Sequence, residues 1–168
     1  MRLLPYRLEG TPGILRPTVD VRLMYGDTGD WNLRALVDTG APISFFDRGA
    51  ADAVGVRLNN AGARRGRIKI LGGDWDVQYE HVQMSLVVDS VHSWSAEVAF
   101  VSSPELQMPF QGVLGTDGFL DKFAVTFNRY YEYFAIERPD DWHERVGRPL
   151  LEDPAGAPDP EWVRPRRD

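Results

Sequence analysis

Cysteine, long apolar runs and an excess of positive charge are all missing from this 168-residue sequence. Without cysteine the chain can form no disulfide, no thiolate nucleophile and no Cys-ligated zinc site. No apolar run approaches the roughly 20 residues that a membrane-spanning helix needs. The net charge of −6 argues against a general binder of nucleic acid or of acidic membranes.

Metal and cofactor motifs are also missing. The three histidines, His81, His92 and His143, show no metal-ligand spacing, and there is no Gly-x-Ser-x-Gly elbow, phosphate-binding glycine loop or His-Glu-x-x-His motif. We therefore expect no metal and no cofactor. The basic run Arg64–Arg67 is short and is interpreted as a solvated loop. Met1–Gly10 has no continuous apolar stretch of signal-peptide length, so we expect a cytoplasmic protein.

Alternation of apolar and polar residues dominates the chain, which is typical of β-strands with one buried face. It predicts strands over residues 19–25, 31–37, 82–88, 94–100, 123–127 and 131–136. The turn cluster at 26–30 joins the first two strands into a hairpin. With 43% hydrophobic residues, the composition suits one globular domain with its own core.

Helical signals are few. Asp47 is expected to cap a short helix through Ala50–Val54 that ends at Gly55. A second short helix is expected from about Thr116 to Lys122. The strands and these helices together predict an all-β, mostly antiparallel protein with one or two short helices.

The composition changes at Pro139, and six of the 12 prolines lie between there and Asp168. The Pro-rich segment 153–160 cannot hold a helix or a strand. We expect one β domain over residues 1–138 and an extended or disordered tail over 139–168. Trp142 and Trp162 are unusual in a disordered tail, which leaves open that part of it docks on the domain or on a partner.

The segment Ala35–Ala41, Ala-Leu-Val-Asp-Thr-Gly-Ala, carries the clearest chemical signal. An apolar strand ends abruptly at Asp38 and so presents a carboxylate. Thr39 supplies a hydroxyl that can lock the loop, and Gly40 allows a tight turn and close approach of a substrate. A second Asp-Thr-Gly copy at 27–29 lies in polar surroundings, and we interpret it as a hairpin loop. The Phe45-Phe46 pair that follows the first copy is interpreted as core.

Two further elements follow in order. Residues 67–79 predict a hairpin with Gly72-Gly73 at its tip, and Gly112–Gly115 places two apolar residues before a glycine. An Asp-Thr-Gly-Ala loop, a hairpin and an apolar-apolar-Gly turn in this order resemble the retropepsin-like aspartic proteases, especially their bacterial, non-viral members. The resemblance covers about residues 15–137. It implies an acid-protease domain with a closed or nearly closed β-barrel.

The resemblance also implies a role for each matching residue. Asp38 matches the catalytic aspartate and Thr39 the threonine that braces the loop against its symmetry mate. Gly40 and Ala41 match the small residues beside the substrate, and Leu114–Gly115 the turn that supports the loop. Leu71, Gly72, Gly73 and Trp75 would form a flap that closes over bound peptide, although an ordinary hairpin explains the same pattern.

Two positions depart from the family pattern. Thr116 stands where an arginine often follows the glycine, and Pro42 stands where polar or acidic residues are common. In viral members that arginine pairs with an aspartate just beyond the active-site loop, and both are missing here. These changes leave the stability of a dimer and the polarity of the substrate site open.

Peptide hydrolysis by this route needs two carboxylates about one water molecule apart, which share a proton and titrate as a unit. Asp27 and Asp117 are candidate partners within one chain, but the first lies in a turn and the second at an expected helix start. We therefore expect a homodimer in which each chain contributes one Asp38. Such a dimer would act as an endopeptidase on peptides or proteins.

Two other interpretations remain. The first is a catalytically silent retropepsin-like module that binds peptides or dimerises, as the changes at Pro42 and Thr116 would allow. The second is an unrelated β-barrel in which both Asp-Thr-Gly copies are accidental.

Overall fold

The computed structural model describes residues 1–27 and 29–147. The strands are β1 (Arg2–Pro5), β2 (Arg7–Glu9), β3 (Ile14–Arg16), β4 (Thr18–Tyr25), β5 (Gly29–Val37), β6 (Phe45–Phe46), β7 (Arg64–Ile70), β8 (Gly73–Leu86), β9 (Asp89–Val101), β10 (Gly112–Leu114), β11 (Ala124–Asn128) and β12 (Tyr133–Glu137). The helices are α1 (Arg48–Val54), α2 (Pro139–Trp142) and the π-helical turn η1 (His143–Gly147). Within this part of the chain no helix is long and apolar enough to cross a membrane.

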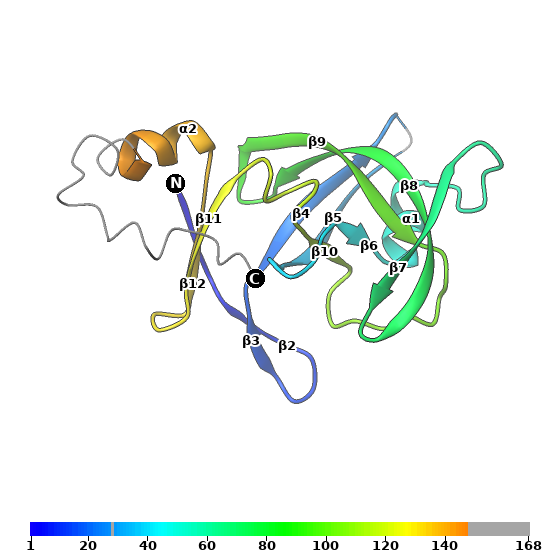
Figure 1. Ribbon diagram of the computed structural model, residues 1–168, viewed down its shortest axis with the longest axis horizontal. Helices are drawn as coiled ribbons and strands as arrows, with labels where there is room; N and C mark the ends of the chain where they lie inside the picture. The colour runs from blue at the N-terminus through cyan, green and yellow to red at the C-terminus, as the bar shows by residue number, and fades with distance from the viewer. Residues whose placement is uncertain (28, 148–168) are drawn as a thin grey trace, which may run out of the picture.

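Six strands close into a barrel in the order β4, β5, β10, β6, β9 and β8, because β8 also pairs with β4 (Figure 1). Strand β7 continues the sheet outside the barrel as a hairpin with β8. Most pairs are antiparallel, but β10 runs parallel to β5, and β6 runs parallel to β9. The all-β barrel with short helices that the sequence predicts is therefore confirmed.

The alternating pattern decides which side chains fill the barrel. In the β4–β5 hairpin, Val19 lies opposite Ala35 and Val21 opposite Leu33, and all four side chains are buried. Neighbouring residues along a strand point to opposite faces, so this register puts the apolar set inside and the charged set outside. The turn between these strands contains Asp27, while Thr28 of the second Asp-Thr-Gly copy lies outside the described residues.

Helix α1 forms where the sequence predicts it. The Asp47 side chain accepts a hydrogen bond from the Ala50 amide at 2.8 Å, which caps the first turn. Gly55 ends the helix with a φ of +80°. Ala51 and Val54 are fully buried, so the helix packs its apolar face against the barrel.

The prediction of a second helix at Thr116–Lys122 is wrong. This segment forms consecutive turns instead. Gly118 has a φ of +93°, which is outside the helical region, and its amide donates to the Asp121 side chain at 3.0 Å. The Leu120 amide reaches back to the Gly115 carbonyl rather than to the i−4 carbonyl of an α-helix.

The tail is also not extended where the structure describes it. Residues 139–147 are helical, because proline is well tolerated in a first helical turn and Arg138 pairs with Asp141 across that turn at 2.9 Å. Arg145 binds the buried Glu137 and ties this segment to β12. Trp142 is half-buried, whereas residues 148–168, with Trp162, lie outside the described residues.

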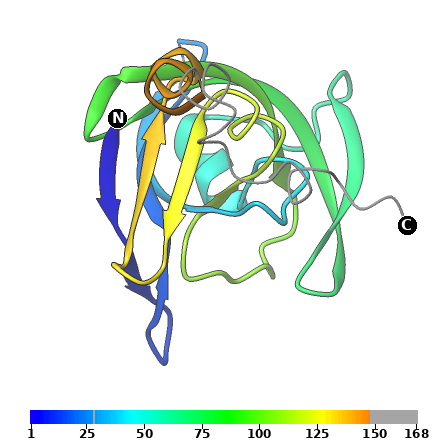
Figure 2. The ribbon, with the colours of Figure 1, turned by 60° about the vertical axis from the view of Figure 1, so that its left-hand side comes forward.

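Two smaller units lie beside the barrel: the sheet β1-β12-β11 and the hairpin β2–β3 (Figure 2). A charged cluster joins the hairpin to the barrel. Asp20 of β4 accepts from Arg7 of β2 at 2.8 Å and from Arg34 of β5 at 3.2 Å. The buried Glu9 side chain accepts from the Thr18 hydroxyl at 2.8 Å. The hairpin is thereby held against the strands that lead to Asp38.

This cluster makes stability depend on pH. Burial alone would raise the pKa of Asp20, but the hydrogen bonds and charges of Arg7 and Arg34 outweigh it and hold the pKa below its usual 3.8. A lowered pKa adds stability that is present above pH 3.8 and is lost as the pH falls through the folded-state pKa. Asp20→Asn should therefore lower the unfolding free energy at pH 7 by no more than about 1 kcal/mol.

Thermal unfolding measured from pH 7 down to pH 3 tests this. The deficit of Asp20→Asn should shrink toward the acid end. Asp74→Asn is the control, because Asp74 is exposed and has no ion pair among the described residues. A deficit of the same size at both ends of the range would contradict the account.

Candidate active site

Asp38 follows the last residue of β5, at the point where β5 and β10 run side by side in parallel. Leu114 lies opposite Val37 in this register, and the Asp38 amide donates to the Leu114 carbonyl at 3.1 Å. Strand β10 lies between β5 and β6. The barrel therefore fixes where the chain leaves β5 and in which direction the loop begins.

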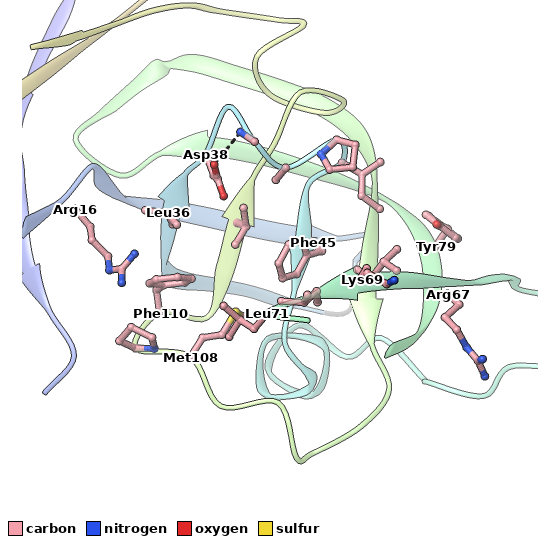
Figure 3. Close-up of a pocket in the computed structure, with 18 residues that line it drawn as sticks. Arg16, Leu36, Asp38, Phe45, Arg67, Lys69, Leu71, Tyr79, Met108 and Phe110 are labelled. Carbon is pink, nitrogen blue, oxygen red and sulfur yellow. Dashed lines mark hydrogen bonds between the residues drawn. The ribbon is translucent and has the colours of Figure 1, made fainter. Parts of the chain in front are cut away.

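The loop after β5 is a tight turn around the Asp38 carboxylate. The Gly40 amide donates to Asp38 Oδ1 at 2.8 Å, as the dashed line in Figure 3 shows. The Ala41 amide donates to the Asp38 carbonyl at 3.3 Å. Asp38 is half-buried, Thr39 and Gly40 are exposed, and Ala41 is buried. One carboxylate oxygen is thus held by the backbone of its own loop.

A second loop supports the first through backbone hydrogen bonds. The Thr116 amide donates to the Ala41 carbonyl at 2.8 Å, and the Asp117 amide donates to the Pro42 carbonyl at 3.0 Å. Ile43 and Asp117 then form a parallel bridge. Since Pro42 and Thr116 take part through their backbones, the two departures from the family pattern leave this packing intact.

A cavity of about 730 Å³ opens beside Asp38. Figure 3 shows the Asp38 carboxylate directed into it, with Leu71, Met108 and Phe110 on the far side. Its walls are mainly apolar and include Leu36, Phe45 and Val113. A concave apolar site with a few convergent polar groups is the usual form of a ligand site.

The β7–β8 hairpin borders the same cavity. Its two-residue turn is Leu71-Gly72, with φ values of +50° and +81°, so the tip lies one residue earlier than expected and Gly73 belongs to β8. Trp75 Nε1 donates to the Ile70 carbonyl at 3.1 Å and braces the tip. Leu71 is 85% exposed and reaches the cavity.

Comparison with known proteins shows which fold family the barrel resembles. No family model and no curated protein matches the chain. Among solved structures, it is similar to a retropepsin-like aspartic protease from Rickettsia conorii, with 11% identity and a TM-score of 0.53 over 82% of this chain and 99% of that one.

This chain has a retropepsin-like fold. It is also similar to the EIAV protease in complex with the inhibitor HBY-793, with 20% identity and a TM-score of 0.42 over 60% of this chain and 82% of that one.

Within this retropepsin-like fold, the predicted residues separate into those that line the cavity and those that support it. Asp38, Gly40, Ala41 and Leu71 line the main cavity. Gly73 and Trp75 shape the hairpin. Leu114 and Gly115 hold the loop from behind. Thr39 borders a second, smaller hollow, which shares Arg16, Leu36 and Asp38 with the main cavity.

Neither of the other candidate aspartates joins Asp38 in the cavity. Asp27 lies in the β4–β5 turn, at the opposite end of β5 from Asp38, and Asp117 is exposed beside the supporting loop. Among the described residues that line the cavity, Asp38 is the only carboxylate. The described residues also hold no cluster of three or more metal-ligating side chains.

Sequence reasoning missed several residues of the site. Ser44 is fully buried. Its hydroxyl donates to the Asp117 carbonyl at 2.9 Å and accepts from the Gly115 amide at 3.0 Å. A small polar residue inside the apolar run Ile43–Phe46 was the available signal.

Phe45, interpreted as core with Phe46, also lines the cavity, whereas Phe46 lies wholly in the core. Arg16, at the end of β3, also lines the cavity. It is 22 residues from Asp38 along the chain, so no local sequence pattern indicated this position.

Gly115 is the position where the two loops approach most closely. A Cβ atom there would lie 2.4 Å from the Ile43 carbonyl oxygen and 2.7 Å from the Ala41 carbonyl oxygen. Both are backbone atoms, so they cannot move aside without separating the loops. We predict that Gly115→Ala lowers the unfolding free energy by about 1–3 kcal/mol or more, the cost of overpacking.

Denaturant unfolding measures this effect. Gly62→Ala is the matched control, because a Cβ atom there would meet nothing within 4 Å, and its stability should stay near that of the wild type. A Gly115→Ala protein as stable as Gly62→Ala would contradict the packing described for the two loops.

Proposed function

We propose that the protein is an aspartic endopeptidase in which Asp38 activates the attacking water. The observation that carries the proposal is the Asp38 carboxylate, held on a tight turn at the end of an apolar strand and directed into a cavity of about 730 Å³. The retropepsin-like fold supports it, since the similar Rickettsia conorii protein is described as an aspartic protease.

The reaction needs two carboxylates around one water molecule. One accepts a proton from the water as its oxygen attacks the peptide carbonyl carbon, and the other donates a proton to the carbonyl oxygen. The C–N bond of the resulting intermediate then breaks as the leaving nitrogen takes up a proton. Since Asp38 is the only carboxylate among the described cavity residues, a second chain has to supply the other one.

We therefore propose a symmetric homodimer with its two-fold axis beside Thr39. A hollow of about 350 Å³ lies there, and the residues that border it include Asp38, Thr39, Arg16, Ile14 and Phe127. Ile14 is 51% exposed and Phe127 36% exposed. Apolar groups that face solvent next to a half-complete site favour burial against a second copy, and two-fold symmetry would bring the two Asp38 side chains together.

The hairpin suggests how an extended peptide would bind. Five consecutive residues, Arg67–Leu71, border the cavity. A cavity on one face of the strand would contact only every second residue, because alternate side chains point to opposite faces. The cavity therefore lies along the edge of β7, which is the outermost strand of its sheet among the described residues. An edge strand offers free backbone donors and acceptors to a peptide in extended form. We propose that the tip at Leu71–Gly72 closes over it as a flap.

Removal of the carboxylate tests the catalytic role. Asp38→Asn should reduce cleavage of a mixed peptide library by about a thousandfold or more, within the range for loss of a general base. Cleavage would be read by mass spectrometry between about pH 3.5 and 7.5, the span over which a shared carboxylate proton can be tuned.

Asp27→Asn is the matched control. It makes the same change in the second Asp-Thr-Gly copy, at the opposite end of β5 from Asp38, and this variant should cleave like the wild type. An active Asp38→Asn protein would refute the assignment. A folded wild-type protein that binds library peptides but leaves them intact would favour the catalytically silent peptide-binding module.

The dimer surface has its own test. Phe127→Glu should convert the dimer into a folded monomer, because it replaces an apolar side chain at the hollow beside Thr39 with a charged one that the second copy would bury. Light scattering and circular dichroism would measure mass and fold. Trp31→Glu is the control, because Trp31 is 54% exposed near the opposite end of β5 from Asp38. Equal effects of the two substitutions on mass would count against this interface.

A further inference from the structure

The charges that line the cavity are unbalanced. Among the described lining residues there are three cations, Arg16, Arg67 and Lys69, against the single carboxylate of Asp38. Arg67 is neutralised locally, since its Nε lies 3.1 Å from an Asp76 oxygen. Arg16 and Lys69 form no ion pair with any carboxylate of the described residues. The cavity thus keeps a surplus of positive charge in a protein whose net charge is −6.

Arg16 is the more constrained of these two cations. Its Nε is buried and has no hydrogen-bond partner among the described residues. A buried donor without a partner is costly, and each one calls for an explanation such as a ligand that completes it. Lys69, by contrast, is exposed on the hairpin, where water satisfies its ammonium group.

The backbone holds Arg16 close to the strand that carries Asp38. Arg16 lies opposite Arg7 at the end of the β2–β3 hairpin, and the carbonyl of the next residue, Pro17, accepts the Val37 amide at 2.9 Å. Figure 3 shows the Arg16 guanidinium entering the cavity from the end opposite Lys69. Arg16 is therefore tied to the residue that directly precedes Asp38.

The walls near this end are apolar. Leu36, Pro109 and Phe110 border the same cavity as Arg16. Apolar walls reduce the screening of a charge, so an anion that reaches the guanidinium there gains more than it would in bulk water. Guanidinium groups bind carboxylates through two parallel hydrogen bonds, which makes them selective for that group.

We propose that Arg16 binds a carboxylate side chain of the substrate, so that the enzyme prefers peptides with Asp or Glu close to the cleaved bond. Arg16 is then a specificity-determining residue, while Asp38 carries out the chemistry. This inference rests on the proposed endopeptidase function and names the class of peptide that the same cavity accepts.

Matched peptides test the proposal. Each peptide that the wild-type protein cleaves would be remade with every Glu replaced by Gln and every Asp by Asn, one position at a time. At one position the acidic peptide should have a kcat/KM about tenfold higher or more, the size expected for one charge-assisted hydrogen bond. The preference should weaken as the salt concentration rises.

Variants of Arg16 connect that preference to the residue. Arg16→Gln should remove the discrimination between Glu and Gln peptides while cleavage of the Gln peptide continues, and Arg16→Glu should shift the preference toward Lys and Arg at that position. Arg16→Lys should keep part of it. Arg57→Gln is the control, because Arg57 is exposed beside a separate hollow after α1, and it should retain the full preference.

The outcomes separate this inference from the proposed function. Failure of the wild-type protein to cleave any peptide would refute the endopeptidase. Cleavage that depends on Asp38 but shows no acidic preference, or a preference that Arg16→Gln retains, would refute the role of Arg16 and leave the endopeptidase standing. Loss of dimer mass in Arg16→Gln with an unchanged preference would show that Arg16 pairs with the second copy, and would also overturn the proposal.

Discussion

Backbone hydrogen bonds between the 38–44 loop and the 114–117 turn hold the Asp38 carboxylate in place, and the geometry of the cavity depends on them. The Leu114 carbonyl accepts the Asp38 amide, and the Ala41 carbonyl accepts the Thr116 amide. These contacts form only because position 115 has no side chain. The buried Ser44 hydroxyl joins both loops a second time. Since nearly all of these bonds come from the backbone, the arrangement tolerates unusual residues at positions 42 and 116.

The barrel gives this pair of loops a rigid base. Strand β10 is parallel to β5 and antiparallel to β6, so both ends of the Asp38 loop start from strands that flank β10. A Cβ atom at Gly112 would lie 2.2 Å from the Phe46 ring, which shows how closely β10 and β6 approach. The β7–β8 hairpin then closes the cavity from the far side. In the proposed function, the chemistry at the Asp38 loop and the binding of a peptide along the edge of β7 would thus come from opposite walls of the same cavity.

Patterns of local origin were predictable from the sequence. Strands β4, β5, β8, β9, β11 and β12 followed from alternation, helix α1 from its caps at Asp47 and Gly55, and the Asp38 loop from an apolar strand that ends at Asp-Thr-Gly. The short strands β1, β2, β3, β6 and β10 were not predicted as strands, because two to four residues are too few to show a period. The helix expected at 116–122 was wrong because the left-handed backbone at Gly118 outweighs the helical preference of its neighbours. The helical segment at 139–147 was not predicted, because the proline-rich composition further along the chain is typical of an extended tail. Ser44, Phe45 and Arg16 reach the site only through tertiary packing, which no local pattern records.

The central claim is that one active site is assembled from two copies of Asp38. Mixing wild-type chains with Asp38→Asn chains, and refolding them together at several ratios, tests it most directly, with cleavage of one library peptide as the readout. If two chains form one site, activity per wild-type chain should fall in proportion to the wild-type fraction, so that total activity follows its square. Activity per wild-type chain that stays constant at every ratio would show that a single chain holds a complete site, and would contradict the account.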